Sequence, residues 1–290
     1  MIFFSIIVTF KPVAADLASL CQTLKNCKSE VIIVDNTELS YLKDINGLEG
    51  STVIPLGKNT GIAYAQNVGI KHAILNGADV VVFFDQDSKI DSEFLSNLLV
   101  PLTTGKPMVV SPVCWDEVNG IEYPSHKLNR YGLPMKIYSN SISEPFYTDI
   151  VIASGSAATT STFKEVGVMD EDFFIDLVDI EWCFRCRSKN VPIQVIPRAI
   201  MRHSIGEAHV KLGAYRGIIH SPTRTYYKVR NCFLLFRKRH VPFLFSITQL
   251  TSALVHNLIL LAFVKNKSQY FNNYIFAVIH GILGIVGKKP

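Results

Sequence analysis

The stretch Val80-Val-Val-Phe-Phe-Asp-Gln-Asp87 decides how this chain is expected to fold. Its apolar run, residues 80–84, is typical of a strand buried on both faces of a parallel sheet. Asp85 and Asp87 follow at the carboxyl end, where open α/β sheets bind ligands. Carboxylate oxygens suit Mg²⁺ or Mn²⁺ bridging a diphosphate. An Asp-x-Asp in this position can also be a helix cap or a solvated turn, so the surrounding sequence has to decide.

Strand and helix patterns alternate around this stretch. In chain order they predict a strand at 3–9, a helix at 13–26, a strand at 31–34, and helices at 61–75 and 91–102 on either side of the strand at 80–84. Such alternation predicts an α/β fold with a parallel, doubly wound sheet and flanking helices. Gly, Pro, Asn and Ser interrupt residues 115–147, which we expect to form a long excursion serving as an active-site or acceptor loop.

Charge is distributed unevenly along the 290 residues. Residues 1–197 carry a net charge of −8, whereas residues 198–290 hold 14 Lys and Arg against one acid, Glu207, a net of +13 that brings the chain to +5. This excess predicts an anionic partner for the last third, although some of the basic residues could pair with the acidic first part. No recognisable nucleic-acid-binding motif accompanies the excess, so we expect no nucleic acid partner.

The C-terminal part has a helical and apolar character. A basic helix is predicted at 222–240, an uncharged helix at 243–264 and a second apolar helix at 270–286. The polar residues within 243–264 make it a poor transmembrane helix. One interpretation is that these helices pack on the domain or on each other; the other is an interfacial anchor whose lysines face lipid phosphates, namely Lys265, Lys267, Lys288 and Lys289. We therefore divide the chain into residues 1–221 and a membrane-associating helical region, 222–290.

The cysteines and the N-terminus predict a protein of the cytoplasm. Cys183-x-x-Cys186 stands alone in a helical pattern, and the six cysteines form no disulfide framework or paired metal motif, which fits a reducing compartment. Residues 1–10 have neither a basic segment nor a small-residue cleavage site, and they are interpreted as the first strand rather than a signal peptide.

Polar residues follow the predicted strands at three places. Thr9, Asp35-Asn36 and Asp85 with Asp87 end successive strands, which in a doubly wound sheet brings them to one crevice. Gly61 permits a tight loop that enters the next helix, whose N-terminus could face a phosphate. The alternative is a glycine-opened amphipathic helix in which Asn67 packs on a loop.

The order and spacing of these motifs resemble glycosyltransferase family 2. The resemblance covers roughly residues 3–239 and rests on Val8-Thr-Phe10, Val34-Asp-Asn36, Asn59-x-Gly-x-Ala-x-Ala-x-Asn-x-Gly-Ile70, Asp85-x-Asp87, Ala153-Ser-Gly-Ser156, Phe173–Arg185 and His203-Ser-Ile-Gly206. It implies the GT-A fold and an inverting, metal-dependent transfer from a nucleotide sugar. Three segments look most like bacterial rhamnosyltransferases of surface-polysaccharide synthesis: Phe83–Ser88, Asp179–Trp182 and Tyr226-Tyr-x-x-Arg-Asn231.

The resemblance also implies roles for individual residues. The nucleotide sugar would be bound by Thr9, Phe10, Asp35, Asn36, Asn59, Gly61, Asn67 and Asp85. The metal, Mg²⁺ or Mn²⁺, would be bound by Asp87, Asp85 and His203. The donor or acceptor sugar would meet Ser154, Gly155, Asp176, Glu181, Trp182 and Arg185.

Asp179 would be the general base. The family has a Glu directly before it, where this chain has Val178, which leaves Asp176 and Glu181 as possible substitutes. Helical spacing places Asp176, Asp179 and Cys183 on one face. Glu181 and Arg185 form an i, i+4 pair on another face, which favours a helix salt bridge for Glu181. We therefore expect Asp179 to be the base.

The resemblance implies transfer of L-rhamnose from dTDP-L-rhamnose to a lipid-linked saccharide. The basic and apolar region 198–290 predicts that the enzyme lies on the inner face of the cytoplasmic membrane. Two alternatives stay open at this point: the same fold using a UDP-hexose donor, and a non-catalytic module that binds a membrane surface. The complete acidic set argues against the second. An oligomer is possible.

Overall fold

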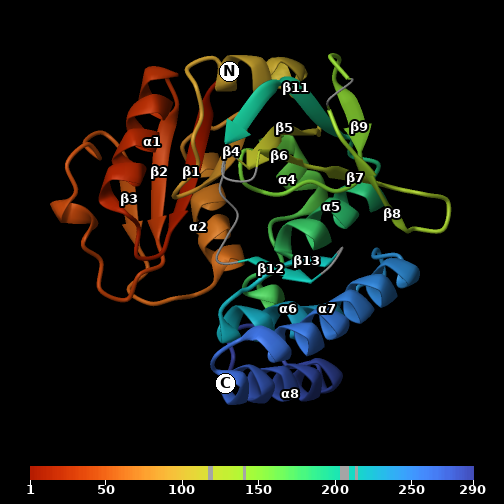
Figure 1. The fold of residues 1–290 in the computed structure, drawn as a ribbon. Helices are drawn as coiled ribbons and strands as arrows, with labels where there is room; N and C mark the ends of the chain where they lie inside the picture. The colour runs from red at the N-terminus through yellow and green to blue at the C-terminus, as the bar shows by residue number, and fades with distance from the viewer. Residues whose placement is uncertain (117–119, 140–141, 203–208, 213–214) are drawn as a thin grey trace.

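The computed structural model describes residues 1–116, 120–139, 142–202, 209–212 and 215–290 (Figure 1). Its centre is a nine-stranded mixed sheet. The strand order is β3 (Thr52–Pro55), β2 (Glu30–Asp35), β1 (Phe3–Thr9), β4 (Val80–Asp85), β10 (Ala157–Thr159), β5 (Val109–Asp116), β11 (Ile193–Arg202) and β9 (Phe146–Thr148), with β6 (Ile121–Tyr123) on β5.

The parallel pairing predicted from the first hundred residues is present in β1 to β4, and β5 and β11 also pair in parallel. β1 to β4 pair in parallel, but β10 runs antiparallel to both of its neighbours and β9 runs antiparallel to β11. The predicted parallel pairing is therefore confirmed for the first hundred residues, and the sheet becomes mixed where β10 and β9 join it. An antiparallel neighbour needs no crossover helix, so the helix–strand alternation of the first hundred residues does not continue there.

Helices cover both faces of the sheet. α1 (Ala14–Asn26) and α3 (Phe94–Leu98) pack on one face, whereas α2 (Ile62–Leu75), α4 (Thr160–Val166) and α5 (Val178–Ser188) pack on the other. The neighbouring strand residues Ile6 and Ile7 belong to different core clusters, as the two-residue period of a strand requires. This double covering explains why the strands contain continuous apolar runs.

Two predicted segments differ from the structure. The helix expected at 91–102 is the short α3 followed by the 3-10 helix η2 (Val100–Thr104), which contains Pro101, a residue without a backbone donor. The excursion at 115–147 contains β6 and the paired strands β7 (Ser125–Leu128) and β8 (Pro134–Ile137), and β9 begins within it. These strands are three or four residues long, too short to show a clear period.

Two further 3-10 helices are η1 (Leu42–Asp44) and η3 (Glu171–Phe173), and β12 (His209–Leu212) pairs with β13 (Tyr215–Ile218).

Three helices form the C-terminal end of the molecule (Figure 1). They are α6 (Pro222–Leu235), α7 (Phe243–Phe263) and α8 (Lys267–Leu283), with a shared core that includes Tyr226, Ala253 and Ala277. Within the described residues, α7 is the one helix whose length and apolar composition would allow it to cross a membrane. α6 also packs against the segment that precedes α5, so it joins the C-terminal helices to the sheet.

Candidate active site

The ends of β1, β2 and β4 lie side by side. Thr9 is in register with Asp35, and Val8 with Asp85. The Thr9 hydroxyl donates to Asp35 Oδ1 at 3.1 Å, and the backbone N–H of Thr37 donates to the same oxygen at 3.1 Å. Asp35 Oδ2 is buried and has no hydrogen-bond partner among the described residues. A buried acceptor of this kind is costly to leave unpaired, so it is suited to a donor on a ligand.

The loop before α2 is held by two asparagines. Asn36 Oδ1 accepts from the backbone N–H and the hydroxyl of Thr60, at 2.7 and 2.9 Å. Asn59 Oδ1 accepts from Asn36 Nδ2 at 3.2 Å and from Gly61 N at 3.1 Å. These amides tie the end of β2 to the loop before α2.

The N-terminus of α2 is covered by the segment that precedes α5. Ile62 N donates to the carbonyl of Phe174 at 2.7 Å. A Cβ atom on Gly61, whose φ is +86°, would lie 2.5 Å from that carbonyl oxygen. The expectation that this helix end faces a phosphate is therefore wrong, because the protein itself supplies the acceptor.

Asn67 has its amide occupied within the protein. It donates to the carbonyl of Met169 at 2.9 Å and to Glu171 Oε1 at 2.8 Å, and it accepts from Met169 N at 2.8 Å. This agrees with the interpretation in which Asn67 packs on a loop, and the structure does not bring its amide groups to the strand ends.

Asp85-Gln-Asp87 forms the turn after β4. Gln86 Oε1 accepts from Phe10 N at 2.7 Å, which ties this turn to the end of β1 and leaves the Phe10 ring 40% exposed. Ser154 Oγ accepts from Asp85 N at 3.1 Å and lies 3.1 Å from the hydroxyl of Ser88. No pattern in the sequence indicated the roles of Gln86 and Ser88, since their partners are distant in the chain.

The structure describes only some of the residues predicted to bind the metal. Among the residues that the structure describes, no group of three or more His, Cys, Asp or Glu side chains is arranged to hold a metal ion. The predicted ligand His203 lies outside the described residues. Asp85 is partly buried and Asp87 is exposed at the strand end, and two such carboxylates are the oxygen ligands that hard divalent cations prefer.

Gly155 fixes the turn that lies between β4 and Asp179. Its φ is +77°, and a Cβ atom there would come within 2.7 Å of the Pro112 side chain. Its N–H donates to the carbonyl of Phe83 at 2.7 Å. The turn thus holds Ser154 against the end of β4.

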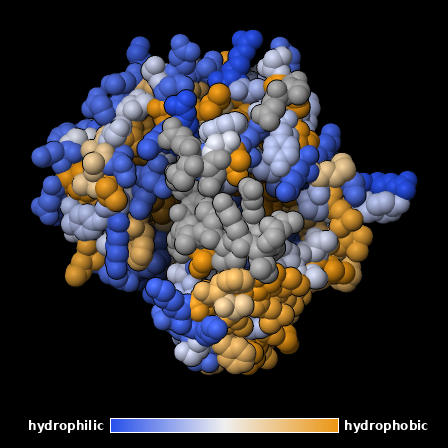
Figure 2. Space-filling model, in the orientation of Figure 1, coloured by the Kyte–Doolittle hydropathy of each residue, from blue (hydrophilic) through white to orange (hydrophobic). Residues whose placement is uncertain are grey.

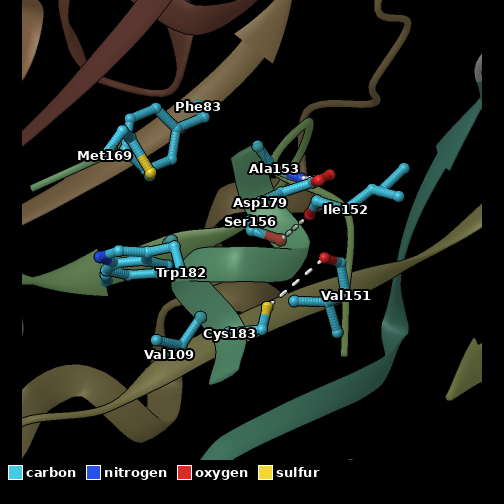
Figure 3. Close-up of a pocket in the computed structure, with 12 residues that line it drawn as sticks. Phe83, Val109, Val151, Ile152, Ala153, Ser156, Met169, Asp179, Trp182 and Cys183 are labelled. Atoms are coloured by element: carbon cyan, nitrogen blue, oxygen red, sulfur yellow. Dashed lines mark hydrogen bonds between the residues drawn. The ribbon is translucent and has the colours of Figure 1, made fainter. Parts of the chain in front are cut away.

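Asp179 lies in the first turn of α5 beside an apolar pocket. Its Oδ1 accepts from Ile180 N at 2.9 Å and its Oδ2 from Ala153 N at 3.3 Å. Figure 3 shows it next to Ala153, above Trp182 and Cys183 of the same helix. Burial raises the pKa of Asp179 to about 6; the backbone hydrogen bonds oppose this shift, and the nearby Asp176 adds to it. The group is thus ionised at neutral pH with a pKa close to that pH, which is the condition for a general base.

Asp176 does not share a helical face with Asp179 and Cys183, so that prediction is wrong. α5 begins only at Val178, because Asp176 and Leu177 have φ values of +64° and +63°. The carboxylate of Asp176 pairs with Arg224 Nη2 of α6 at 3.2 Å. This ion pair, which the spacing could not reveal, directs Asp176 toward α6.

The expected salt bridge of Glu181 is confirmed. The Glu181 side chain is 1% exposed, and its oxygens meet Arg185 Nη2 at 2.9 Å and His240 Nε2 at 2.7 Å. The Trp182 ring lines the same pocket as Asp179, and its indole N–H donates to the carbonyl of Gly167 at 2.9 Å. Glu181 and Arg185 are thus paired with each other, and the structure does not bring them to the ends of β1, β2 and β4.

Comparison with known proteins agrees with this geometry. The family model described as glycosyl transferase family 2 matches residues 5–164. The dTDP-rhamnosyl transferase RfbF of Shigella flexneri is 40% identical over 98% of this chain and 96% of its own length. The low-salt glycan biosynthesis hexosyltransferase Agl10 of Haloferax volcanii is 24% identical over 98% and 92%.

Solved structures show the same fold at low sequence identity. GalNAc-T7 with UDP, GalNAc and Mn²⁺ has a TM-score of 0.55 and 14% sequence identity; the match covers 71% of this chain and 46% of the GalNAc-T7 chain. S. aureus TarS 1-349 in complex with UDP-GlcNAc has a TM-score of 0.56 and 16% identity over 98% of this chain and 82% of its own. At such identities the likeness supports the fold alone.

Proposed function

This chain belongs to glycosyl transferase family 2, and we propose that it moves L-rhamnose from dTDP-L-rhamnose to a saccharide hydroxyl, with inversion at the anomeric carbon. The observation that carries this proposal is the 40% identity, over nearly the full length of both chains, to a protein named a dTDP-rhamnosyl transferase. The crevice at the strand ends and the carboxylate of Asp179 provide the chemistry for it.

The nucleotide occupies the ends of β1 and β2. Asp35 Oδ2, which is buried without a partner among the described residues, accepts the N3–H of thymine. The exposed ring of Phe10 offers an apolar face for the base. Thr9 and Thr37 hold the other carboxylate oxygen, so the orientation of Asp35 is fixed before the nucleotide arrives.

Asp179 removes the proton from the attacking hydroxyl. The hydroxyl oxygen forms a bond to the anomeric carbon from the side opposite the diphosphate, the bond to the diphosphate breaks, and dTDP leaves with the bonding electrons. The proton ends on Asp179. General-base assistance of this kind contributes roughly 10²–10⁴-fold to a rate.

A divalent cation fits the carboxylates after β4. Asp87 and Asp85 would hold Mg²⁺ or Mn²⁺, with the predicted help of His203. When bound, the cation neutralises negative charge that develops on the departing diphosphate.

We also place the protein on the inner face of the cytoplasmic membrane, where it meets a lipid-linked acceptor. Apolar side chains gather over α7 and α8 in Figure 2; the exposed ones include Phe243, Leu258, Phe271, Ile279, Ile282 and Leu283. Lys265 and Lys267 are exposed at the turn between these helices. Apolar burial and attraction to anionic lipid heads, at roughly 1 kcal/mol per basic residue near the surface, support reversible binding.

Some basic residues of the C-terminal region form ion pairs within the protein. Arg224 pairs with Asp176, and Lys238 pairs with Asp170 and Asp172. For these residues the structure confirms pairing with the acidic first part of the chain. The membrane proposal therefore rests on the lysines at the turn between α7 and α8 and on the exposed apolar side chains.

A panel of donors tests the proposed reaction. Purified protein is supplied with Mg²⁺ or Mn²⁺ and with dTDP-L-rhamnose, UDP-glucose, UDP-galactose or UDP-N-acetylglucosamine, and release of the nucleoside diphosphate is measured. We expect the highest kcat/KM with dTDP-L-rhamnose, and Asp179→Asn serves as the matched control for background hydrolysis. A higher value with a UDP-hexose overturns the donor assignment, and no turnover of any donor favours a non-catalytic module.

Co-sedimentation with liposomes tests the membrane assignment. Binding is expected with vesicles that contain anionic lipid, and it should weaken as salt rises because charges are screened within about 8–10 Å. Protein that stays in the supernatant with every vesicle assigns the apolar face to packing against another protein surface instead.

A further inference from the structure

The motif Tyr226-Tyr-x-x-Arg230-Asn231 lies on α6, on the far side of the segment 173–177 from α2. We propose that Arg230 and Asn231 are positioning residues for Asp179, because they hold segment 173–177, whose backbone determines where α5 begins. This inference rests on the base role given to Asp179 in the proposed function.

Segment 173–177 has an unusual backbone. Phe174, Asp176 and Leu177 have φ values of +62°, +64° and +63°, and none of them is glycine. Residues with a Cβ atom rarely adopt this region, so three of them close together need surrounding contacts that hold them there. The segment ends at Leu177, the N-cap of α5, two residues before Asp179.

Asn231 provides those contacts from α6. Its side-chain amide lies 2.8 Å from the carbonyl oxygen of Phe173, 2.7 Å from that of Ile175 and 2.8 Å from that of Asp176. An NH₂ group has two hydrogens, so one hydrogen must be shared between two of these three carbonyls. All three carbonyls come within reach of one amide because the backbone bends around it. Asn231 therefore holds three carbonyls of this segment around a single side-chain amide.

Arg230 orients that amide and closes the arrangement. Its Nε donates to Asn231 Oδ1 at 2.7 Å, and its Nη2 donates to the Phe173 carbonyl at 3.2 Å. Both side chains are 0% exposed. The Arg230 Nη1 donates to the carbonyls of Ile285 and Gly287, at 2.9 and 3.1 Å. A buried guanidinium is tolerated only when its donors are satisfied, which explains why it is surrounded by carbonyls.

Tyr227 of the motif also packs on this segment. The Tyr227 ring stacks on the Phe174 ring with centroids 4.7 Å apart, and the Arg230 guanidinium lies 5.3 Å from the centre of the Tyr227 ring. On the opposite side, Ile62 of α2 donates to the Phe174 carbonyl. The segment is thus held between α2 at the nucleotide crevice and α6.

A displacement of this segment reaches Asp179 directly. The carboxylate keeps its place through hydrogen bonds to Ile180 N, on α5, and to Ala153 N, on a different loop. If α5 starts at a different residue or angle, the contact with Ala153 is lost. Misplacing a reacting group by about 1 Å can cost roughly 10²-fold in rate.

The test compares Asn231→Leu with Leu260→Ala. Leucine has nearly the shape of asparagine but no donors. Leu260 is buried in α7 with Val264 and Tyr270, apart from segment 173–177, so its truncation controls for general destabilisation. Arg230→Lys, which keeps the charge and loses the forked geometry, is a milder second variant in case Asn231→Leu does not fold.

Two measurements are made on the full-length protein. The first is release of dTDP from dTDP-L-rhamnose with water as the acceptor, where we expect kcat to fall by roughly 10–100-fold in Asn231→Leu while KM changes little. The second is the titration of the Asp179 carboxyl followed by ¹³C NMR, with its signal assigned by its loss in Asp179→Asn. Within the part of the chain that the structure describes, the titratable groups that act on the Asp179 carboxyl are Asp176, itself paired with Arg224, and Cys183, whose own pKa is raised by burial.

In Asn231→Leu the Asp179 midpoint should move from about 6 toward the ordinary value of a carboxyl, because the group leaves its buried position. Leu260→Ala should lower the melting temperature and leave kcat, KM and the midpoint unchanged. An Asn231→Leu or Arg230→Lys protein with wild-type kcat and midpoint overturns the inference. Absence of dTDP release by the wild type would reject the proposed function, and the NMR midpoints would still decide the positioning role.

Discussion

Replacement of Gly61 by alanine is the sharpest test of how the N-terminus of α2 meets the segment before α5. Gly61 has φ +86° and ψ 162°, a region of backbone space that is essentially restricted to glycine. A Cβ atom would lie 2.5 Å from the Phe174 carbonyl oxygen and 2.7 Å from its ring. The substitution is therefore opposed both by backbone strain and by contact with a neighbouring backbone atom.

The expected cost follows from these two terms. Holding a residue other than glycine in such a conformation costs about 1–3 kcal/mol. Moving the Phe174 carbonyl away breaks its hydrogen bond with Ile62 N, which adds about 1 kcal/mol. We therefore expect a loss of roughly 2–4 kcal/mol in the free energy of unfolding, which for a large domain corresponds to a melting temperature lower by roughly 5–15 °C.

Thermal and urea unfolding of Gly61→Ala and Gly105→Ala measure this directly. Gly105 also has a positive φ, +67°, but no atom lies within 4 Å of its Cβ position, so alanine there costs about 1–2 kcal/mol from backbone strain alone. Gly61→Ala should also reduce transfer, because Phe174 cannot move without segment 173–177. Equal melting temperatures for the two variants, together with full activity of Gly61→Ala, would refute the close approach of α2 and this segment.

Three further substitutions test the proposed roles of the acidic side chains. Asp179→Asn should lower turnover by about 10²–10⁴-fold with donor binding nearly intact. In the wild type, kcat should rise with pH through about 6 as Asp179 loses its proton. A mild loss in Asp179→Asn beside a severe loss in Asp176→Asn would assign the base role to Asp176. Asp87→Ala should abolish transfer and weaken metal-dependent dTDP binding by calorimetry, and near-normal turnover would exclude the metal role. Glu181→Ala should lower the free energy of unfolding by about 1–3 kcal/mol, since it leaves the partly buried guanidinium of Arg185 without its carboxylate partner, and wild-type stability in urea would contradict that.

The parts of the fold that the sequence predicted are those fixed by local patterns. β1, β2, β4, α1 and α2 agree with the predicted strands and helices to within about one residue at each end, because long apolar runs and helical spacing are properties of the segment itself. β10 has only three residues and pairs with β4 and β5, whose residues are far away in the chain. No local pattern indicates such an insertion, and its antiparallel direction was missed for the same reason.

The candidate site likewise has residues that a local motif reveals and supporting contacts that no local motif reveals. The side chains proposed to act on a ligand, Asp35, Asp87 and Asp179, have chemical identities that a motif can display. Their supports were harder to predict, since a positive φ at Phe174, Asp176 and Leu177 leaves no glycine to mark it. The i, i+3 spacing that placed Asp176 beside Asp179 assumed a helix that begins two residues too early.

The Arg230–Asn231 pair shows why a motif can be recognised and yet remain unexplained. Its partners are backbone carbonyls of segment 173–177 and of Ile285 and Gly287, and a carbonyl is the same whatever residue carries it. The motif therefore has no matching signature elsewhere in the sequence, and only the structure reveals what it holds. The boundary predicted between residues 221 and 222 separates α6 from the segment that α6 supports. Region 222–290 therefore also supports the first part of the chain: a protein lacking it would keep the side chain of Asp179 but lose the contacts that define where α5 begins.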